Sequence, residues 1–315
     1  MIDNNNYLIK IKTVQISAFK MLIEALKEIF RDLVFKVVPK TNNTGNNNHK
    51  GCIAVSALNS HGNVFVKLKL PAEKFEEFYC DPETDTPVLI GVNMGQFYKL
   101  IKTMANDDTL TLFIDKNRQN ELGIRLENVK KRYRTEYKLL LLDLPKEENR
   151  TIPESKFKFV ITMLSQDFHN LVKNMSIIAD NVDIKYIDIP ETRDTLIFNC
   201  KGDFASQETQ FVDTDKEDDI TDKKTVKIKH ENNELCTNQI IQGMYQLQTL
   251  SLFSKCASLS NNLEIYMKDN FPLIIKYMIA NLGHVYLILS SVTDKNDYSD
   301  DDEDEDDEDE EFTTI

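Results

Sequence analysis

The stretch FYKLIKTMANDDTLTLFID, residues 97–115, contains the two patterns that decide the fold. Phe97, Leu100, Ile101 and Met104 recur at positions i, i+3, i+4 and i+7, which places them on one side of an amphipathic helix. After the polar turn ANDD, the segment TLTLFID alternates between two faces, as a strand with one buried face does. The stretch therefore predicts a helix that leads through a short turn into a strand.

The same helical pattern recurs twice, in FKMLIEAL at residues 19–26 and in FHNLVKNM at residues 168–175. A fourth helix is expected over QGMYQLQTLSLFSK, residues 242–255, where the pattern fits more loosely. This segment also leads through a polar turn, SLSNN, into the alternating segment LEIYMKD at residues 263–269. The sequence thus predicts two copies of one plan, a duplication on the scale of half the chain.

Other alternating segments predict further strands, and together with the helices they favour an α+β fold. Two closing strands are expected at LIIKYMIA and VYLILSS, joined by a turn at residues 281–283 where Gly283 can adopt a positive φ. Between the copies, KLLLLDLPKEENRTIPES becomes polar and contains two prolines, which is typical of a linker that crosses a surface. The remaining predicted strands are residues 64–70, 121–127 and 224–230.

These patterns divide the chain into four parts. We expect an N-terminal domain at residues 1–137, a connector at residues 138–156, a C-terminal domain at residues 157–293 and an acidic tail at residues 294–315. A length of 315 residues is sufficient for two domains, each with its own core. The Asn-rich segment at residues 41–50 and the acidic segment at residues 213–224 are predicted to be loops.

The net charge of −14 is concentrated at the C-terminus. Residues 294–315 contain fourteen acidic residues and one lysine, a net charge of −13, which leaves −1 for residues 1–293. The folded part can therefore bind nucleic acid if its charges are separated into a basic and an acidic side. Three roles remain open for the tail: competition with a nucleic acid for lysines, binding of basic partners, or solubility.

Several classes of protein are not indicated. The five cysteines occur singly, which favours neither a disulfide framework nor a zinc site. The phosphate-binding and hydrolase motifs are absent, and nine glycines leave little material for a phosphate-cradling loop. The apolar stretch at residues 271–292 is interrupted by Lys276, Asn281 and His284, which favours two strands over a membrane span. We expect no enzyme activity, catalytic residue, metal, cofactor or membrane contact.

Lysines lie on the polar sides of the predicted helices. Lys20 and Lys27 are seven residues apart and share one face, and Lys99 and Lys102 are three apart. If the helices line one surface, their lysines form a basic track suited to sequence-independent contact with phosphates. The alternative is ordinary solvating charge, which Glu24 and Glu28 on the first helix favour.

Four collinear segments resemble one known family. They are VQISAFKMLIEALKEI at residues 14–29, GVNMGQFYKLIKTMANDDTLTL at 91–112, LLDLP through TIPES at 141–155, and FPLIIKYMIANLGHVYLIL at 271–289. The chain resembles proliferating cell nuclear antigen, the DNA sliding clamp. This resemblance implies two tandem clamp domains and a homotrimeric ring whose helices line a central hole and whose sheets lie outside.

The resemblance also implies a function. Such a ring encircles double-stranded DNA, serves as a processivity factor for DNA polymerase, and is a docking platform for a clamp loader and for replication and DNA repair proteins. Met21, Asn170 and Gln248 stand where the family usually has basic residues, so we hypothesise weaker DNA contact and faster sliding. The DNA-binding residues implied are Lys20, Lys27, Lys99, Lys102, Lys173 and Lys255 near or on the helices, and Lys131 on the strand before the connector.

Partner peptides with apolar and aromatic anchors are expected to bind a pocket beside the connector. The matching positions are Leu58 (or its neighbour Ala57), His61, Ile152, Pro153, Pro272, Ile288 and Ser290. The alternative for the prolines and Ile152 is simple packing of connector and strand ends. Subunit contacts in the family fall, by position, at about residues 131–138 and 195–202 of this chain.

Other functions remain possible on the sequence alone. One is a monomeric or heterotrimeric clamp-like factor, and another is an acidic-tailed chaperone of histones or other basic proteins. The bias toward Asn, Ile and Lys suggests an AT-rich genome of a protist or large DNA virus. We therefore expect the protein in the nucleus, or at a cytoplasmic replication site if it is viral.

Overall fold

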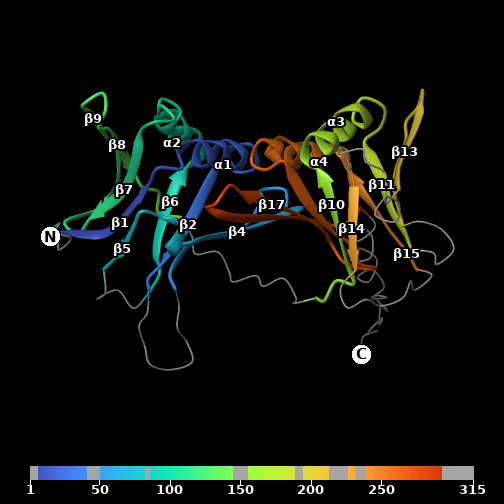
Figure 1. The fold of residues 1–315 in the computed structure, drawn as a ribbon, viewed down its shortest axis with the longest axis horizontal. Helices are drawn as coiled ribbons and strands as arrows, with labels where there is room; N and C mark the ends of the chain where they lie inside the picture. The colour runs from blue at the N-terminus through green and yellow to red at the C-terminus, as the bar shows by residue number, and fades with distance from the viewer. Residues whose placement is uncertain are drawn as a thin grey trace, which may run out of the picture.

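The computed structural model describes residues 6–40, 50–81, 86–144, 155–188, 194–212, 226–230 and 239–292. The molecule is elongated, and its helices form a layer along one side of it, with the sheets behind them and at both ends (Figure 1). The helices are α1 (Ile16–Ile29), α2 (Met94–Ile101), α3 (Ser165–Met175) and α4 (Leu247–Ser254), with short 3₁₀ turns at η1 (Ala72–Lys74) and η3 (Lys255–Ser258).

A five-stranded antiparallel sheet, in the order β5-β1-β7-β8-β9, forms the outer end of the N-terminal half. Its strands are β1 (Tyr7–Thr13), β5 (Glu77–Cys80), β7 (Thr109–Asp115), β8 (Arg118–Asn128) and β9 (Tyr133–Leu140). The C-terminal half ends in a four-stranded sheet in the order β13-β12-β11-β15. Its strands are β11 (Asn181–Asp188), β12 (Thr195–Lys201), β13 (Ser206–Val212) and β15 (Gln239–Gln246).

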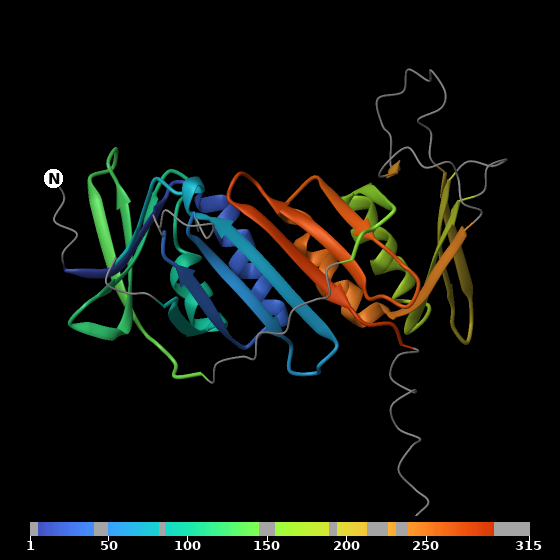
Figure 2. The ribbon, with the colours of Figure 1, turned by 90° about the horizontal axis from the view of Figure 1, so that it is seen from below.

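A nine-stranded sheet joins the two halves, in the order β14-β10-β16-β17-β18-β4-β3-β2-β6. The join is the antiparallel pair of β18 and β4, in which Val285 lies opposite Leu68. Figure 2 shows this sheet running unbroken across the middle of the molecule, with the helices behind it. Its strands are β2 (Asp32–Val38), β3 (Cys52–Leu58), β4 (Val64–Pro71), β6 (Val88–Asn93), β10 (Phe159–Leu164), β14 (Val226–His230), β16 (Asn262–Tyr266), β17 (Leu273–Ile279) and β18 (Gly283–Leu289).

Most predicted elements are confirmed, but the fourth helix is shorter than expected. Residues 239–246 form strand β15, and the helix begins only at Leu247. Ile241 and Tyr245 are buried and alternate with less buried residues, as in a strand. The segment pairs with β11 and becomes an edge strand of the four-stranded sheet. The strand expected over residues 263–269 likewise ends at Tyr266.

The closing hairpin turns as expected, although Gly283 has a second role. Ala280 adopts a positive φ of 45° within the turn. A Cβ on Gly283 would lie 2.2 Å from the carbonyl oxygen of Lys69. Glycine is therefore required because β4 and β18 approach closely at the point where the two halves join.

The N-terminal core is centred on Phe97 of α2. Asn93 caps this helix, since its side chain accepts a hydrogen bond from the Gln96 amide at 3.0 Å. The Phe97 ring packs edge-on against Phe19 and Phe35, each at a centroid distance of 6.4 Å. It also lines an apolar cavity of about 30 Å³, which loss of the ring would enlarge.

Phe97→Ala should therefore lower the free energy of unfolding by about 3–5 kcal/mol, through lost burial and an enlarged cavity. Urea unfolding followed by circular dichroism would measure the loss. The control is Met278→Ala, whose side chain is exposed and should change stability by no more than about 0.5 kcal/mol. Equal losses in both variants would contradict this assignment of the core.

Candidate nucleic-acid interface

The four helices lie together on one side of the molecule, with the sheets on the other side and at both ends (Figure 1). Each helix turns its apolar stripe inward: in α1 the buried residues include Phe19, Leu22 and Leu26. The two halves meet on this surface, where the Lys255 ammonium of η3 lies 2.7 Å from a Glu28 carboxylate oxygen of α1. Six of the seven lysines proposed to face DNA lie on these helices or at their ends.

Glu28 neutralises part of this surface. Its carboxylate accepts from Lys255 at 2.7 Å and from Lys27 at 3.1 Å. The hydrogen bond from Lys255, and then that from Lys27, hold the pKa of Glu28 below its usual range. The Lys27 ammonium also lies 4.4 Å from the centre of the Tyr98 ring. Two of the expected DNA-binding lysines therefore share one carboxylate in this structure.

Glu28→Gln should free both lysines without changing the shape of the side chain. We expect affinity for duplex DNA at low salt to rise about threefold to tenfold, because more ammonium groups become available for phosphates. Fluorescence anisotropy with a labelled duplex would measure it. The matched control is Glu24→Gln, whose carboxylate accepts from the Tyr98 hydroxyl at 2.7 Å and not from a lysine. An equal rise in the control would contradict the role given to Glu28.

Lys20 has a structural contact as well as a charge. It is half-buried, and its ammonium donates to the Met104 carbonyl oxygen at 2.9 Å, which ties α1 to the end of α2. Lys99, Lys102 and Lys173 differ, since all three are exposed and form no ion pair with another described residue. They are the lysines of this surface with fully available charge.

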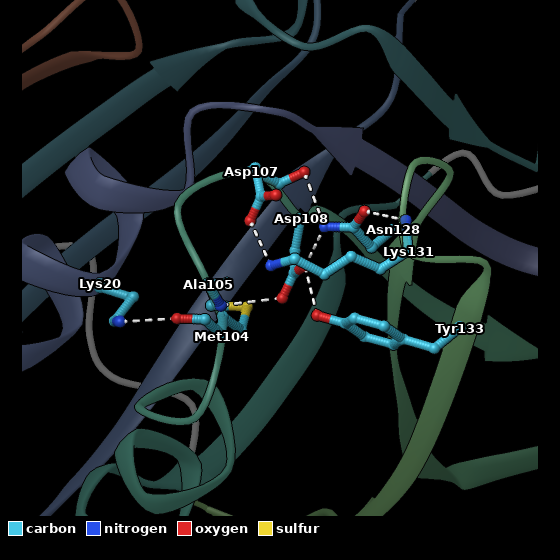
Figure 3. A network of polar contacts seen from close by, with 8 residues as sticks. All are labelled: Lys20, Met104, Ala105, Asp107, Asp108, Asn128, Lys131 and Tyr133. Atoms are coloured by element: carbon cyan, nitrogen blue, oxygen red, sulfur yellow. Dashed lines mark hydrogen bonds and ion pairs between the residues drawn. The ribbon is translucent and has the colours of Figure 1, made fainter.

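Lys131 lies in the turn between β8 and β9, and not on a strand as expected. Figure 3 shows it within a polar network at the end of the helical surface. Its ammonium lies 3.3 Å from Asp107, and its amide donates to the Asn128 side chain at 2.9 Å. The turn is thereby held against the segment that joins α2 to β7.

Asp108 is the buried centre of this network. Its carboxylate accepts from the Asn128 amide at 2.9 Å, from the Ala105 backbone amide at 2.8 Å, and from the Tyr133 hydroxyl. Burial opposes ionisation of Asp108, but the hydrogen bonds together outweigh it and lower its pKa. The hydrogen bond that the Tyr133 hydroxyl donates to Asp108 raises the pKa of Tyr133 to about 12. The network fixes the start of β9 relative to the helical surface.

Asp108→Asn should reduce the free energy of unfolding by about 2 kcal/mol at pH 7, since a buried ionised acceptor is lost. The pKa of Asp108 is lowered by folding, so its contribution is present above the unfolded value of about 3.9 and disappears as pH falls through the folded value. Urea unfolding at pH 7 and pH 3 would test this, with Asp203→Asn, an exposed carboxylate outside the network, as control. A difference that persists unchanged at pH 3 would contradict a charge effect.

The three positions expected to lack basic residues are on the same surface. Met21 is half-buried and packs against the core. Asn170 of α3 is exposed and accepts from Gln166 at 3.1 Å, and Gln248 of α4 is exposed. None of these side chains can contribute positive charge.

The described residues expected to bind partner peptides lie at the ends of the central strands β3, β4, β17 and β18, on the side of the nine-stranded sheet opposite the helices. Leu58 pairs with Phe65 of β4, Phe65 pairs with Ile288 of β18, and Ile288 pairs with Ile274 of β17. Cross-strand partners share a face, so these side chains form an apolar row outside the main core. His61 and Ser290 are exposed at the same end, and Pro272 immediately precedes β17. Ala57 is buried inward, whereas Ile152 and Pro153 lie outside the described residues.

The expected subunit contact at residues 195–202 is wrong. Strand β12 is interior, because it pairs with β11 on one side and with β13 on the other. The edge strand of this sheet at that side is β13, and the edge strands of the five-stranded sheet are β9 and, at its other side, the short β5. Sequence reasoning missed β13 because SQETQFV is largely polar; its alternation, which buries Phe211 partly against Phe198, was the available signal.

Strands β9 and β13 lie at opposite ends of the long molecule in both views (Figures 1 and 2). Exposed apolar side chains accompany each edge. Leu140 of β9 is 67% exposed, and Val212 of β13 is 43% exposed. Unpaired strand edges with apolar neighbours are suited to pairing with another chain.

The described part of the chain has neither a cluster of metal ligands nor a membrane-spanning helix. No three His, Cys, Asp or Glu side chains there converge as metal ligands. No helix among the described residues has the length and apolarity needed to cross a membrane.

Comparison with known proteins gives matches over almost the whole chain. Residues 8–148 match the family model of the proliferating cell nuclear antigen N-terminal domain, and residues 151–292 match that of the C-terminal domain. A probable DNA polymerase sliding clamp of Acanthamoeba polyphaga mimivirus is 28% identical over 93% of this chain, which spans 64% of that relative's length. The probable DNA polymerase sliding clamp 1 of Paramecium bursaria Chlorella virus 1 is 28% identical over 92% of this chain and 99% of its own.

Proposed function

The chain belongs to the proliferating cell nuclear antigen family, and we propose from this premise that it acts as a DNA sliding clamp. In this proposal, three copies form a ring that encircles duplex DNA. The ring has no catalytic activity of its own; it holds DNA polymerase on the template by topology.

The observation that carries the proposal is the pair of free edges at opposite ends of one chain. When β9 of one copy pairs with β13 of the next, the contact is head-to-tail, and repeating it by a rotation of one third of a turn closes a three-membered ring. Because the helices all lie on one side of the sheets, that side becomes the wall of the hole. Exposed lysines that form no ion pair with another described residue, such as Lys99 and Lys173, then face the phosphates of the encircled duplex.

Contact with DNA in this clamp is loose. Glu28 forms ion pairs with Lys27 and Lys255. The side chains of Met21, Asn170 and Gln248 carry no positive charge. Fewer phosphate contacts lower the barrier to movement along DNA, so we propose fast sliding. Single-molecule tracking would test this, and diffusion slower than that of an ordinary clamp would contradict it.

The apolar row that includes Leu58, Phe65 and Ile288 supports a docking role. We propose that DNA polymerase, the clamp loader and DNA repair proteins insert short apolar or aromatic peptide segments here, beside His61, Pro272 and Ser290. The relatives named above come from viruses. We accordingly propose that the protein works at a viral replication site.

Retention on circular DNA tests the ring directly. After loading on a nicked circle, the protein should survive gel filtration with the DNA and should be released when the circle is cut. Blocking both ends of the linear DNA with bound streptavidin should restore retention, because a ring cannot pass the blocks. Equal retention on open linear DNA would contradict encirclement and favour a groove-binding protein or a chaperone.

A further inference from the structure

The nine-stranded sheet carries a cluster of lysines on its outer side, opposite the helices. Strand alternation puts them there: Lys67 and Lys69 of β4 flank the buried Leu68, and Lys227 and Lys229 of β14 flank the buried Ile228. Lys276 of β17 has the same orientation. We refer to Lys67, Lys69, Lys227, Lys229 and Lys276 as the outer lysine cluster.

Strand pairing brings these residues into one band across the sheet. Lys67 pairs with Tyr286, which pairs with Lys276, and Lys276 pairs with Glu264 of β16. The band continues from Glu264 through Thr162 of β10 to Lys227. The outer lysine cluster therefore spans the sheet from β4 to β14.

Its charge is poorly compensated. The Lys276 ammonium lies 2.9 Å from a carboxylate oxygen of Glu264. Glu264 is the one carboxylate among the outward-facing described residues between β14 and β3. Lys67, Lys69, Lys227 and Lys229 are exposed and form no ion pair with another described residue. Burial, and then the charges of Lys276, Lys69 and Lys67 against that of Glu264, lower the pKa of His284, which pairs with Lys69 in the strand register.

Among the described outward-facing residues between β14 and β3, five lysines against one carboxylate leave an excess of four positive charges. On the helical side, acidic residues such as Glu24, Glu28 and Asp107 lie among the lysines. A concentration of like charge favours a polyanionic partner. The chain contains such a segment, since residues 294–315 carry fourteen acidic residues, twelve of them without interruption at 300–311.

The acidic segment also begins at a suitable place. It follows Val292, whose amide donates to the Met244 carbonyl oxygen at 2.9 Å, just after β18 ends at Leu289. Tyr286 lies in the lysine band six residues before Val292, about 20 Å of extended strand. Residues 293–299 alone can span up to ~23 Å, so the acidic run is within reach of the band.

We propose that the acidic C-terminal segment of this chain docks on the outer lysine cluster of its own nine-stranded sheet. The DNA-facing lysines on the helical side are then left free, and the outer side is occupied until another polyanion or a stronger partner displaces the segment. This proposal does not depend on ring formation.

Zero-length carbodiimide cross-linking of the full-length protein, followed by mass spectrometry, tests the docking. Cross-links from carboxylates of residues 294–311 to Lys67, Lys69, Lys227, Lys229 or Lys276 are expected, and should disappear at 1 M salt. Cross-links chiefly to Lys99, Lys102 and Lys173 would overturn the proposal, as would the absence of cross-links from the segment. In a mixture of isotopically light and heavy chains, cross-links between chains at these lysines would also overturn it.

Lysine acylation rates give a second readout. A variant of equal length, with the acidic residues at 300–311 changed to their amides, should expose the cluster. Acylation of Lys67, Lys69 and Lys229 should then become about two- to fivefold faster, as expected for several weak ion pairs acting together. Lys99 serves as the internal control and should not change. Equal acceleration at Lys99 would reduce the effect to one of net charge and overturn the proposal.

Discussion

Leu140→Asp and Val212→Asp should each convert the assembled protein into single chains of 36.5 kDa. The two side chains are exposed and lie on β9 and β13, the free edges at opposite ends of the molecule. In the proposed ring both become part of the contact between neighbours, where a carboxylate would be desolvated without a partner. Loss of one well-packed apolar side chain from such a contact costs about 2 kcal/mol or more, so the dissociation constant should rise at least roughly 30-fold.

Mixing the two variants distinguishes a head-to-tail contact from a symmetric one. The Leu140→Asp chain keeps an intact β13 and the Val212→Asp chain keeps an intact β9, so one contact can form between them but no ring can close. Native mass spectrometry should therefore show a one-to-one dimer. The control Met278→Asp introduces the same charge on the exposed outer side and should leave assembly unchanged. Single chains in the mixture, or three-chain assemblies of either variant alone, would contradict the proposed contact.

The helices and most strands could be predicted because their signal is local. The i, i+3, i+4, i+7 stripe of residues 97–104 depends only on nearby residues, and α2 buries Phe97 and Ile101 as that stripe requires. The predicted helix at residues 242–246 was wrong for the opposite reason. Their helical pattern was weak, and pairing with β11 provided backbone hydrogen bonds that the sequence could not reveal. The positions of β12 inside the sheet and β13 at its edge likewise depend on how all four strands pair, which the local sequence does not reveal.

The candidate interface was predictable in its residues but not in its charges. Helical spacing places Lys20, Lys27 and Lys99 on polar sides, and the structure agrees. That Lys255 meets Glu28 was not predictable, because these residues are 227 positions apart and come together only when the two halves pack. The contact of Lys20 with the Met104 carbonyl similarly depends on how α1 packs against α2. Spacing identifies a basic side, while packing decides which charges on it are free.

That distinction leads to the strongest expected effect on DNA binding. The triple variant Lys99→Glu, Lys102→Glu, Lys173→Glu reverses the three helical-side lysines that have no ion pair with a described residue. Affinity for duplex DNA should fall at least about 100-fold at 0.1 M salt, and the slope of log K against log salt should become shallower by about 3. Because all three side chains are exposed, circular dichroism and native mass should not change.

The matched control places the same charge change on the other side of the molecule. Lys67→Glu, Lys69→Glu, Lys227→Glu also reverses three exposed lysines, but these lie across the sheet from the helices. Both triple variants are made in the chain whose acidic residues at 300–311 are changed to amides, so that release of that segment does not affect the comparison. If DNA passes along the helical side, the control should retain most of its affinity, and its salt slope should change little. Equal losses of DNA affinity in the two variants would show that net charge alone governs binding. That result would contradict the proposal that the helical surface faces the DNA.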